Sequence, residues 1–152
     1  MFRGNHLYSV DDKGRVAIPA RFIKELSGPQ DERLVVTRFK RRNRPCLDVY
    51  PLSVWQRLEE RIATKKRFNK KVAAFESWYV GAAQDVQLDG QGRLLIPPTL
   101  RTHAGIGREV MFVGATDKFQ IWDKDVFEQV DREDERELFE DPDSTVLEDL
   151  EL

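Results

Sequence analysis

The sequence contains few of the residues that build covalent crosslinks or reactive sites. It has a single cysteine, Cys46, which excludes an internal disulfide, and its place at the start of a predicted strand favours a core residue over a nucleophile. The only histidines are His6, beside a strand, and His103, in the last turn of a short helix. No H-E-x-x-H, paired-cysteine or carboxylate–histidine cluster is present. We therefore predict no metal, no cofactor, no catalytic residue and no small-molecule substrate.

Long apolar segments are also missing. No run approaches the roughly 20 apolar residues that a membrane helix requires, and residues 1–6 lack the apolar stretch of a signal peptide. With one cysteine and no membrane segment, we expect a cytoplasmic protein. The chain has 152 residues, of which 40% are hydrophobic and 34% charged. It is long enough for a hydrophobic core, and too aromatic and too patterned to be disordered throughout.

Charge is distributed very unevenly along the chain. The formal net charge is only −2, yet residues 1–80 carry 18 Lys and Arg against 9 Asp and Glu, and residues 81–152 carry 7 against 18. The acidic excess is concentrated in residues 131–152, which hold 11 acids and 2 bases. A chain polarised in this way offers a positive surface to a polyanion despite its acidic overall balance.

The most informative motif occurs twice. DDKGRVAIP at 11–19 reappears as DGQGRLLIP at 89–97, and an offset of 78 aligns Asp, Gly, Arg, Ile and Pro without a gap. An internal repeat of this kind indicates two copies of one supersecondary unit. Whatever role Arg15 has, we expect Arg93 to have it too.

Each copy predicts a strand, a tight turn, a return strand, a short helix and two further strands. In the first copy these are strands 6–10 and 15–18 around the turn 11–14, a helix at 19–26 closed by Gly28, strands 34–37 and 46–50 joined by a basic loop at 38–44, and a helix from about Ser53. In the second copy they are strands 85–88 and 93–96 around the turn 89–92, a helix at 97–103 closed by Gly105, strands 110–113 and 119–122, and a helix that opens at 125–130.

These elements divide the chain into four parts: a first repeat at 5–52, connecting helices at 53–80, a second repeat at 81–124, and a helix with an acidic tail at 125–152. A unit of about 45 residues buries too little surface to be stable alone, so we expect both repeats to share one barrel-like core. The predicted class is α+β, mainly β. Edge strands left in a small open barrel favour symmetric self-association.

The two motif turns allow a structural and a functional interpretation. In the structural one, Asp11 bridges to Arg15 and simply holds the turn, with Gly14 at positive φ. In the functional one, the glycine tightens the tip so that Arg15 and Lys13 project, and a two-stranded ribbon that presents arginine fits the major groove of DNA. The interpretations are compatible, because a carboxylate that orients a guanidinium also makes it rigid. Neither copy fits a phosphate-binding G-x-x-x-x-G-K-[ST] or G-x-G-x-x-G loop.

Three further charged segments remain to be interpreted. The basic loop 38–44 is either solvated or contacts nucleic-acid phosphates or the acidic tail of a neighbouring subunit. The cationic stretch 65–71 is most simply a solvated helix face. The acidic C-terminal segment is either a mobile solubilising tail or a screen that competes with DNA for a basic surface.

Several motifs together resemble one family. They are the opening MFRG, the Asp-x-x-x-Arg pairs at 11–15 and 89–93, the segment 45–51 and the segment 95–105, and they cover about residues 1–130 in order. These motifs are similar to those of the MraZ family, bacterial regulators of the division and cell-wall gene cluster. The segment after about Asp131 matches least, and no role is transferred to it.

The resemblance implies a fold, a function and a set of contact residues. The fold is a swapped-hairpin β-barrel of the AbrB/MazE-like group, assembled into homo-oligomeric rings. The function is repression of transcription through double-stranded DNA, at short direct repeats in the promoter of the protein's own operon, which implies association with the nucleoid. By motif position the DNA contacts fall on Arg15 and Arg93, supported by Asp11, Gly14, Asp89 and Gly92, with Lys13 and Arg3 as neighbours.

The two copies are not expected to contribute equally. Gln91 stands where the first copy has Lys13, so we predict that the first turn contributes more of the phosphate affinity. A protein-interaction scaffold or antitoxin-like module on the same barrel is the alternative function. DNA binding that depends steeply on salt distinguishes the regulator from the scaffold, because phosphate contacts release counterions.

Overall fold

In a computed structural model that describes residues 1–26 and 33–152, the two repeats form the same series of elements. The first repeat contains β1 (Asn5–Ser9), β2 (Arg15–Ala17), α1 (Ala20–Glu25), β3 (Arg33–Arg41) and β4 (Arg44–Pro51). The second contains β5 (Gln84–Gln87), β6 (Arg93–Leu95), α4 (Pro98–Ala104), β7 (Glu109–Ala115) and β8 (Lys118–Asp123). Gly28, which was predicted to close the first helix, lies outside the described residues. Gly105 closes α4 as predicted.

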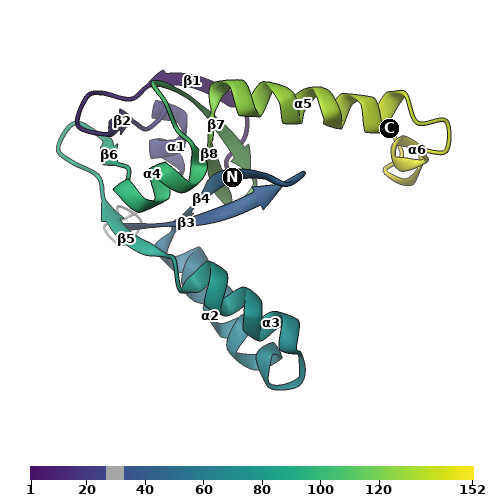
Figure 1. Ribbon diagram of the computed structural model, residues 1–152, viewed down its shortest axis with the longest axis horizontal. Helices are drawn as coiled ribbons and strands as arrows, with labels where there is room; N and C mark the ends of the chain where they lie inside the picture. Colours follow the sequence, from purple (N-terminus) through teal and green to yellow (C-terminus); the bar gives the residue numbers. More distant parts are fainter. Residues whose placement is uncertain (27–32) are drawn as a thin grey trace.

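Helices follow each repeat. The first repeat continues into α2 (Leu52–Lys65), the 3₁₀-helix η1 (Lys66–Phe68), α3 (Lys70–Phe75) and the π-helix η2 (Glu76–Val80), and the second into α5 (Lys124–Phe139) and α6 (Val146–Asp149). The protein is therefore mixed, with about 42% helix and 32% strand, and not mainly β. Figure 1 shows the two helical arms, α2–α3 and α5, leaving the sheet in different directions. Within the described residues, no helix is long and apolar enough to cross a membrane.

The strands form two open antiparallel sheets and no closed barrel. Six strands lie in the order β1-β7-β8-β4-β3-β5, and β2 pairs with β6 in a separate two-stranded ribbon. The order is unchanged when each strand is exchanged for its counterpart in the other repeat. The internal symmetry relates Val16 to Leu94 and Asp48 to Gln120, and each of these pairs is directly opposed in its ladder. The duplicated sequence is thus arranged about a local twofold axis.

The predicted pairing of β1 with β2 as a simple hairpin is also wrong. The tight turn between them forms, but β1 pairs with β7 and β2 pairs with β6. By the same symmetry β5 pairs with β3 and not with β6. The reason is packing: Val16 on the three-residue β2 reaches an exposed fraction of 1% by lying opposite Leu94 over the sheet. A short turn therefore determines the local geometry of the chain, whereas packing in the core determines which strand each segment pairs with.

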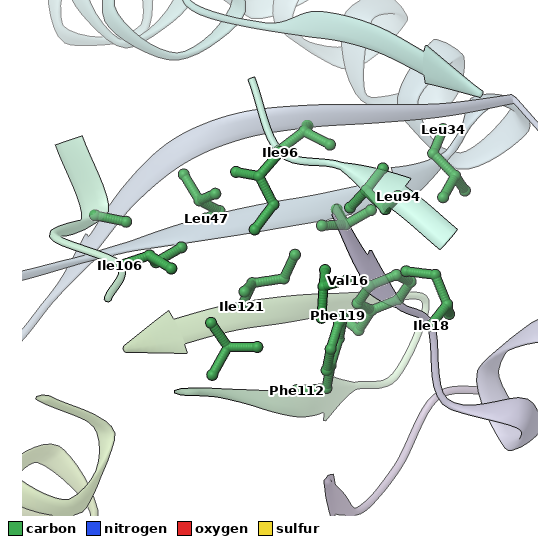
Figure 2. Close-up of a cluster of buried hydrophobic side chains, with 14 of the residues drawn as sticks. Val16, Ile18, Leu34, Leu47, Leu94, Ile96, Ile106, Phe112, Phe119 and Ile121 are labelled. Atoms are coloured by element: carbon green, nitrogen blue, oxygen red, sulfur yellow. The ribbon is translucent and has the colours of Figure 1, made fainter. Parts of the chain in front are cut away.

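The main core lies between the six-stranded sheet and the β2–β6 ribbon, as Figure 2 shows. Val16 and Leu94, and likewise Ile18 and Ile96, are the apolar positions of the two motif copies, and all four are buried. They contact sheet residues that alternate along their strands, namely Leu34, Val36, Leu47, Val49, Phe112, Phe119 and Ile121. Fully burying such a side chain contributes roughly 1.5–3 kcal/mol. The apolar part of the motif therefore holds the ribbon on the sheet.

The opposite face of the sheet is covered by the helices that follow β4 and β8. Tyr50 packs against Val54 and Trp55 of α2 and against Tyr79 of η2, while Trp122 packs with Cys46 and with Val130 of α5. Cys46 is buried, as its strand position predicted. Residues 52–80, which include the stretch 53–80 where connecting helices were predicted, form four consecutive helical segments.

A buried polar network lies on this helix-covered face, between α2 and α5. The fully buried Asp48 carboxylate accepts hydrogen bonds from the Tyr79 hydroxyl, from Gln120 Nε2 at 2.8 Å and from Lys118 Nζ at 3.2 Å. Trp122 Nε1 in turn donates to Gln120 Oε1 at 3.0 Å. Burial lowers the pKa of Lys118, but the Asp48 charge, the neighbouring Tyr50 and the hydrogen bonds to both together outweigh it, and the net shift is upward. The network joins β4, β8 and the connecting helices.

The basic segment 38–44 is not a loop. β3 and β4 extend through it in continuous register to the pair Arg41–Arg44, which leaves Arg42 and Asn43 as a two-residue turn with φ of 52° and 60°. Two positive φ values identify a type I′ turn, the geometry that matches the twist of a hairpin. The acidic segment also begins as structure, because α5 continues to Phe139, and a mobile tail from Asp131 onward is therefore wrong.

Candidate nucleic-acid interface

The two motif turns have nearly identical hydrogen bonds. Asp11 Oδ1 accepts from the backbone N–H groups of Lys13 at 2.9 Å and Arg15 at 2.8 Å, and Asp11 Oδ2 accepts from Arg15 Nε at 2.9 Å. The corresponding distances at Asp89 are 2.8 Å to Gln91, 2.9 Å to Arg93 and 2.8 Å to Arg93 Nε. The repeated sequence therefore produces a repeated geometry.

Each aspartate both closes its turn and orients its arginine. The pKa of Asp11 is lowered, first by the hydrogen bond from the Arg15 backbone and then by the Arg15 side chain, and the pKa of Asp89 is lowered in the same way by Arg93. The carboxylates are thus ionised at neutral pH. Each takes only the Nε–H of its guanidinium, so the four N–H groups on the two terminal nitrogens are not used by the aspartate.

The glycines bring the two turns together. Gly14 and Gly92 have φ of 86° and 71°, backbone angles that residues with a side chain rarely adopt. The Gly14 carbonyl accepts from Ile96 N at 3.0 Å and the Gly92 carbonyl accepts from Ile18 N at 3.1 Å. Each turn is therefore bonded to the strand of the other repeat, and Figure 1 shows β2 and β6 side by side at one end of the molecule.

Both arginines lie on the outward face of the β2–β6 ribbon. Val16 and Leu94 occupy the buried face, so the alternation of a strand puts Arg15 and Arg93 on the other one. Arg15 opposes Leu95, which is two residues from Arg93 on the same strand. The Cα atoms of Arg15 and Arg93 are therefore on the order of 8 Å apart. Their side chains are about one third exposed, 33% and 31%. The structure thus brings the two predicted contact arginines onto one surface.

The surroundings of the two turns differ. The guanidinium of Arg101 lies beside the first turn, with Nη1 3.4 Å from where a Cβ on Gly14 would stand, and its orientation comes from hydrogen bonds to the carbonyls of Ile106 and Gly107. At the second turn the corresponding neighbour is Ile23. Arg101 comes from α4 of the other repeat, so only its position in space marks it as part of this surface. The first turn is the more cationic one.

Arg3 does not join this surface. It precedes β1, whereas the first turn follows β1, so the full length of that strand, about 14 Å, separates Arg3 from Lys13. Arg3 instead lines a shallow surface pocket with Met1, Arg21 and Glu25. The structure therefore groups Lys13, Arg15 and Arg93 and leaves Arg3 apart.

The residues considered for catalysis lie apart from one another. Burial raises the pKa of the Cys46 thiol, which keeps it protonated at neutral pH. A ring nitrogen of His103 lies 3.3 Å from the carbonyl oxygen of Phe39. His6 packs edge-on against Phe22, and its buried Nε2 has no hydrogen-bond partner among the described residues. In residues 1–26 and 33–152, no three His, Cys, Asp or Glu side chains gather in a group that could hold a metal ion.

Comparison with known proteins agrees with the duplicated architecture. Residues 1–77 and residues 79–150 each match the family described as "MraZ protein, putative antitoxin-like". The chain belongs to the MraZ family. The match confirms the family resemblance that the paired motifs predicted, and its two segments correspond to the two repeats.

Curated members of the MraZ family are similar over most of their length. A protein of Yersinia pseudotuberculosis named "Transcriptional regulator MraZ" is 38% identical, and the alignment covers all of both chains. Proteins of the same name from Acidithiobacillus ferrooxidans and Pseudoalteromonas translucida are 42% and 39% identical. These alignments cover 81% and 88% of this chain, and 83% and 87% of the relatives.

Proposed function

We propose that this protein is a sequence-specific, DNA-binding transcriptional regulator that reads DNA with the outward face of the β2–β6 ribbon. The observation that carries the proposal is the matched pair of aspartate-oriented arginines, Arg15 and Arg93, on one exposed surface. The names of its relatives, which are transcriptional regulators, support the same class of function.

The chemistry of the surface fits duplex DNA. A two-stranded ribbon is narrow enough to enter the major groove, where arginine donates two hydrogen bonds to guanine O6 and N7. Holding each guanidinium through its Nε leaves the terminal nitrogens to make that contact. Lys13 lies at the rim of the first turn, where an ammonium pairs with a phosphate without reading sequence. The first turn therefore contributes more of the phosphate affinity.

The family resemblance extends the proposal to assembly and target. Exchange of β1 and β5 between the repeats is consistent with the AbrB-like swapped-hairpin group. The same two strands are the edges of the six-stranded sheet and supply free backbone groups for self-association into a homo-oligomeric ring. A ring presents several ribbons to short direct repeats, so that avidity adds to the affinity of each. Repression of the protein's own division and cell-wall operon, at the nucleoid, completes the proposal.

A gel-shift titration tests the proposal. The probe is the promoter fragment upstream of the protein's own gene, at several salt concentrations, with Arg15→Ala, Arg93→Ala and the control Arg57→Ala on the exposed face of α2. Each motif variant should lose about 1–3 kcal/mol of specific binding per lost contact, and the control should bind like the wild type. Operator affinity unchanged in a folded, correctly assembled Arg15→Ala protein would contradict the assignment.

The same titration addresses the scaffold alternative. Binding of wild-type protein that falls steeply with salt and prefers the promoter fragment supports the regulator. Absent or salt-insensitive binding favours a protein-interaction module. The description of the family as antitoxin-like is compatible with this alternative.

A further inference from the structure

The tip of the β3–β4 hairpin carries a second cluster of arginines, which is covered by the acidic end of α5. Asp134 Oδ1 accepts from Arg41 Nη2 at 2.6 Å and from Arg42 Nε at 2.7 Å. Arg42 also donates to Glu137, and Arg44 Nη1 donates to Glu133 at 2.7 Å. Three guanidinium groups thus face three carboxylates that are about 90 residues away along the chain.

The acidic end of α5 is held by charge and not by apolar contact. The last residue of α5 buried in the core is Val130, and beyond it the apolar residues Leu138 and Phe139 are exposed. Glu133, Asp134 and Glu137 lie within four positions on the side of the helix that faces the hairpin. Such half-exposed ion pairs are weakened by salt and by competing charges. A polyanion can therefore replace the helix.

The second repeat shows that the hairpin does not need these charges to fold. The equivalent hairpin, β7–β8, turns through Thr116 and Asp117 and has no arginine at its tip. The helix equivalent to α5 is α2, where Arg61 and Lys65 occupy the positions that correspond to Glu133 and Glu137. The arginine cluster and its acidic cover are thus an addition to one repeat, made on a turn that forms without them.

The cluster lies away from the proposed recognition surface. In Figure 1 the β2–β6 ribbon is at the left end of the molecule, whereas the tip of the β3–β4 hairpin points to the right, beneath α5. An uncovered arginine cluster at this end would hold DNA in an orientation in which the motif turns cannot read the same segment.

We propose that the tip formed by Arg41, Arg42 and Arg44 is a second binding site for the phosphate backbone of duplex nucleic acid, and that the acidic end of α5 keeps it closed. The closed form confines DNA to the motif turns, and release of the helix adds a binding mode that does not depend on sequence. The three guanidinium groups, fixed around a two-residue turn, have the geometry and charge to contact consecutive phosphates.

The test compares two variants of α5 that lose the same charge. E133Q/D134N/E137Q removes the carboxylates that face the arginines, and E128Q/E135Q/E140Q removes three that do not. The probe is a random-sequence duplex without operator repeats, measured by fluorescence anisotropy from 50 to 300 mM salt. The first variant should bind on the order of tenfold tighter at low salt than the control variant, with a salt slope steeper by about 2.7 for three phosphate contacts.

The arginines supply the second arm of the test. Adding R41Q/R42Q/R44Q to E133Q/D134N/E137Q should return random-duplex binding to about the wild-type level, whereas the same change in the wild-type background should weaken binding much less, because there DNA must first displace the helix. The proposal is overturned if the two helix variants bind alike, or if the arginine changes weaken binding equally in both backgrounds.

A measurement on the unaltered chain covers the case in which a variant misfolds. Saturating random duplex at low salt should speed amide hydrogen exchange in residues 133–139 of the wild-type protein, because DNA displaces the helix end. Unchanged exchange there contradicts the proposal. This proposal rests on DNA binding but not on the assignment of Arg15 and Arg93. Its probe is a random duplex, so operator affinity that is unchanged in the Arg15→Ala and Arg93→Ala proteins would contradict that assignment without changing the result expected here.

Discussion

The two repeats agree at the motif turns and in the apolar core beneath them, and differ in the side chains around those turns. Asp11 and Asp89 make the same three hydrogen bonds, and Val16 and Leu94 oppose each other in the same ladder. The side chains at the turns diverge, with Lys13 and Arg101 beside one and Gln91 and Ile23 beside the other. The comparison teaches that duplication preserved the scaffold and left the surface free to specialise.

The charged residues where the two repeats meet do not follow the twofold symmetry. Asp48 opposes its own counterpart, Gln120, across the junction between the repeats, but Lys118 has Cys46 as its counterpart. The ion pair between Lys118 and the buried Asp48 therefore has no symmetric copy, and it connects the repeats from one side.

Removing one partner of the buried ion pair should produce the largest effect. Lys118→Met leaves the Asp48 charge without its counter-ion, which costs roughly 3–5 kcal/mol of the free energy of unfolding when a buried pair is broken. Urea unfolding followed by circular dichroism measures the loss. The double variant Asp48→Asn/Lys118→Met should recover most of it, and the exposed Lys65→Met should stay within about 0.5 kcal/mol of the wild type. A single variant as stable as the wild type would show that the pair does not join the repeats.

Alanine at the two turn glycines should produce an intermediate effect that differs between the copies. Either substitution places a side chain at positive φ, at a cost of about 1–2 kcal/mol. Gly92→Ala should cost slightly more than Gly14→Ala, by no more than about 1 kcal/mol, because its Cβ would stand 2.9 Å from Ile23 Cδ1 and this flexible side-chain end must rotate aside, whereas the nearest atom at Gly14 is 3.4 Å away. Thermal and urea unfolding measure both. Adding Ile23→Ala to each variant and to the wild type should abolish the difference, and equal costs without it would refute the steric explanation.

Exchanging the charged residue between the turns should produce the smallest effect. Lys13→Gln removes one phosphate contact and should reduce the slope of log affinity against log salt by about 0.9, while Gln91→Lys should increase it by a similar amount. Sequence preference should change little in either variant, because phosphate contacts carry no base information. Anisotropy titrations with operator and random duplexes provide the measurement. Equal slopes for wild type and Lys13→Gln would remove the predicted dominance of the first turn.

Much of the candidate site was predictable from the sequence because its contacts are local. Asp11 and Arg15 are four residues apart, so their hydrogen bonds depend on the turn and not on the rest of the fold. Residue order and the glycine position predicted both turns. Arg101 escaped prediction because it reaches Gly14 from a helix of the other repeat, a contact between residues 87 positions apart.

The strand pairing and the acidic cover of the hairpin escaped prediction for the same reason. Nothing local in β1 indicates that it pairs with β7 and not with β2. The basic segment 38–44 was predicted to be a loop because most of its residues are charged, so it lacks the alternation of apolar and polar residues that is typical of a strand. Its partners on α5 are about 90 residues away. The sequence showed a cationic half and an acidic tail, but not that they meet within one chain.

The duplication, the family and the geometry of the two Asp–Arg turns follow from the order of residues alone, because they depend on residue identity and on hydrogen bonds over two to four positions. The exchange of strands between the repeats, the surface that the two arginines share and the position of the acidic helix emerge only when the chain is folded. These outcomes depend on burying Val16 against Leu94 and Trp122 against Val130. Such contacts join distant segments through the core, where no local pattern specifies the partner.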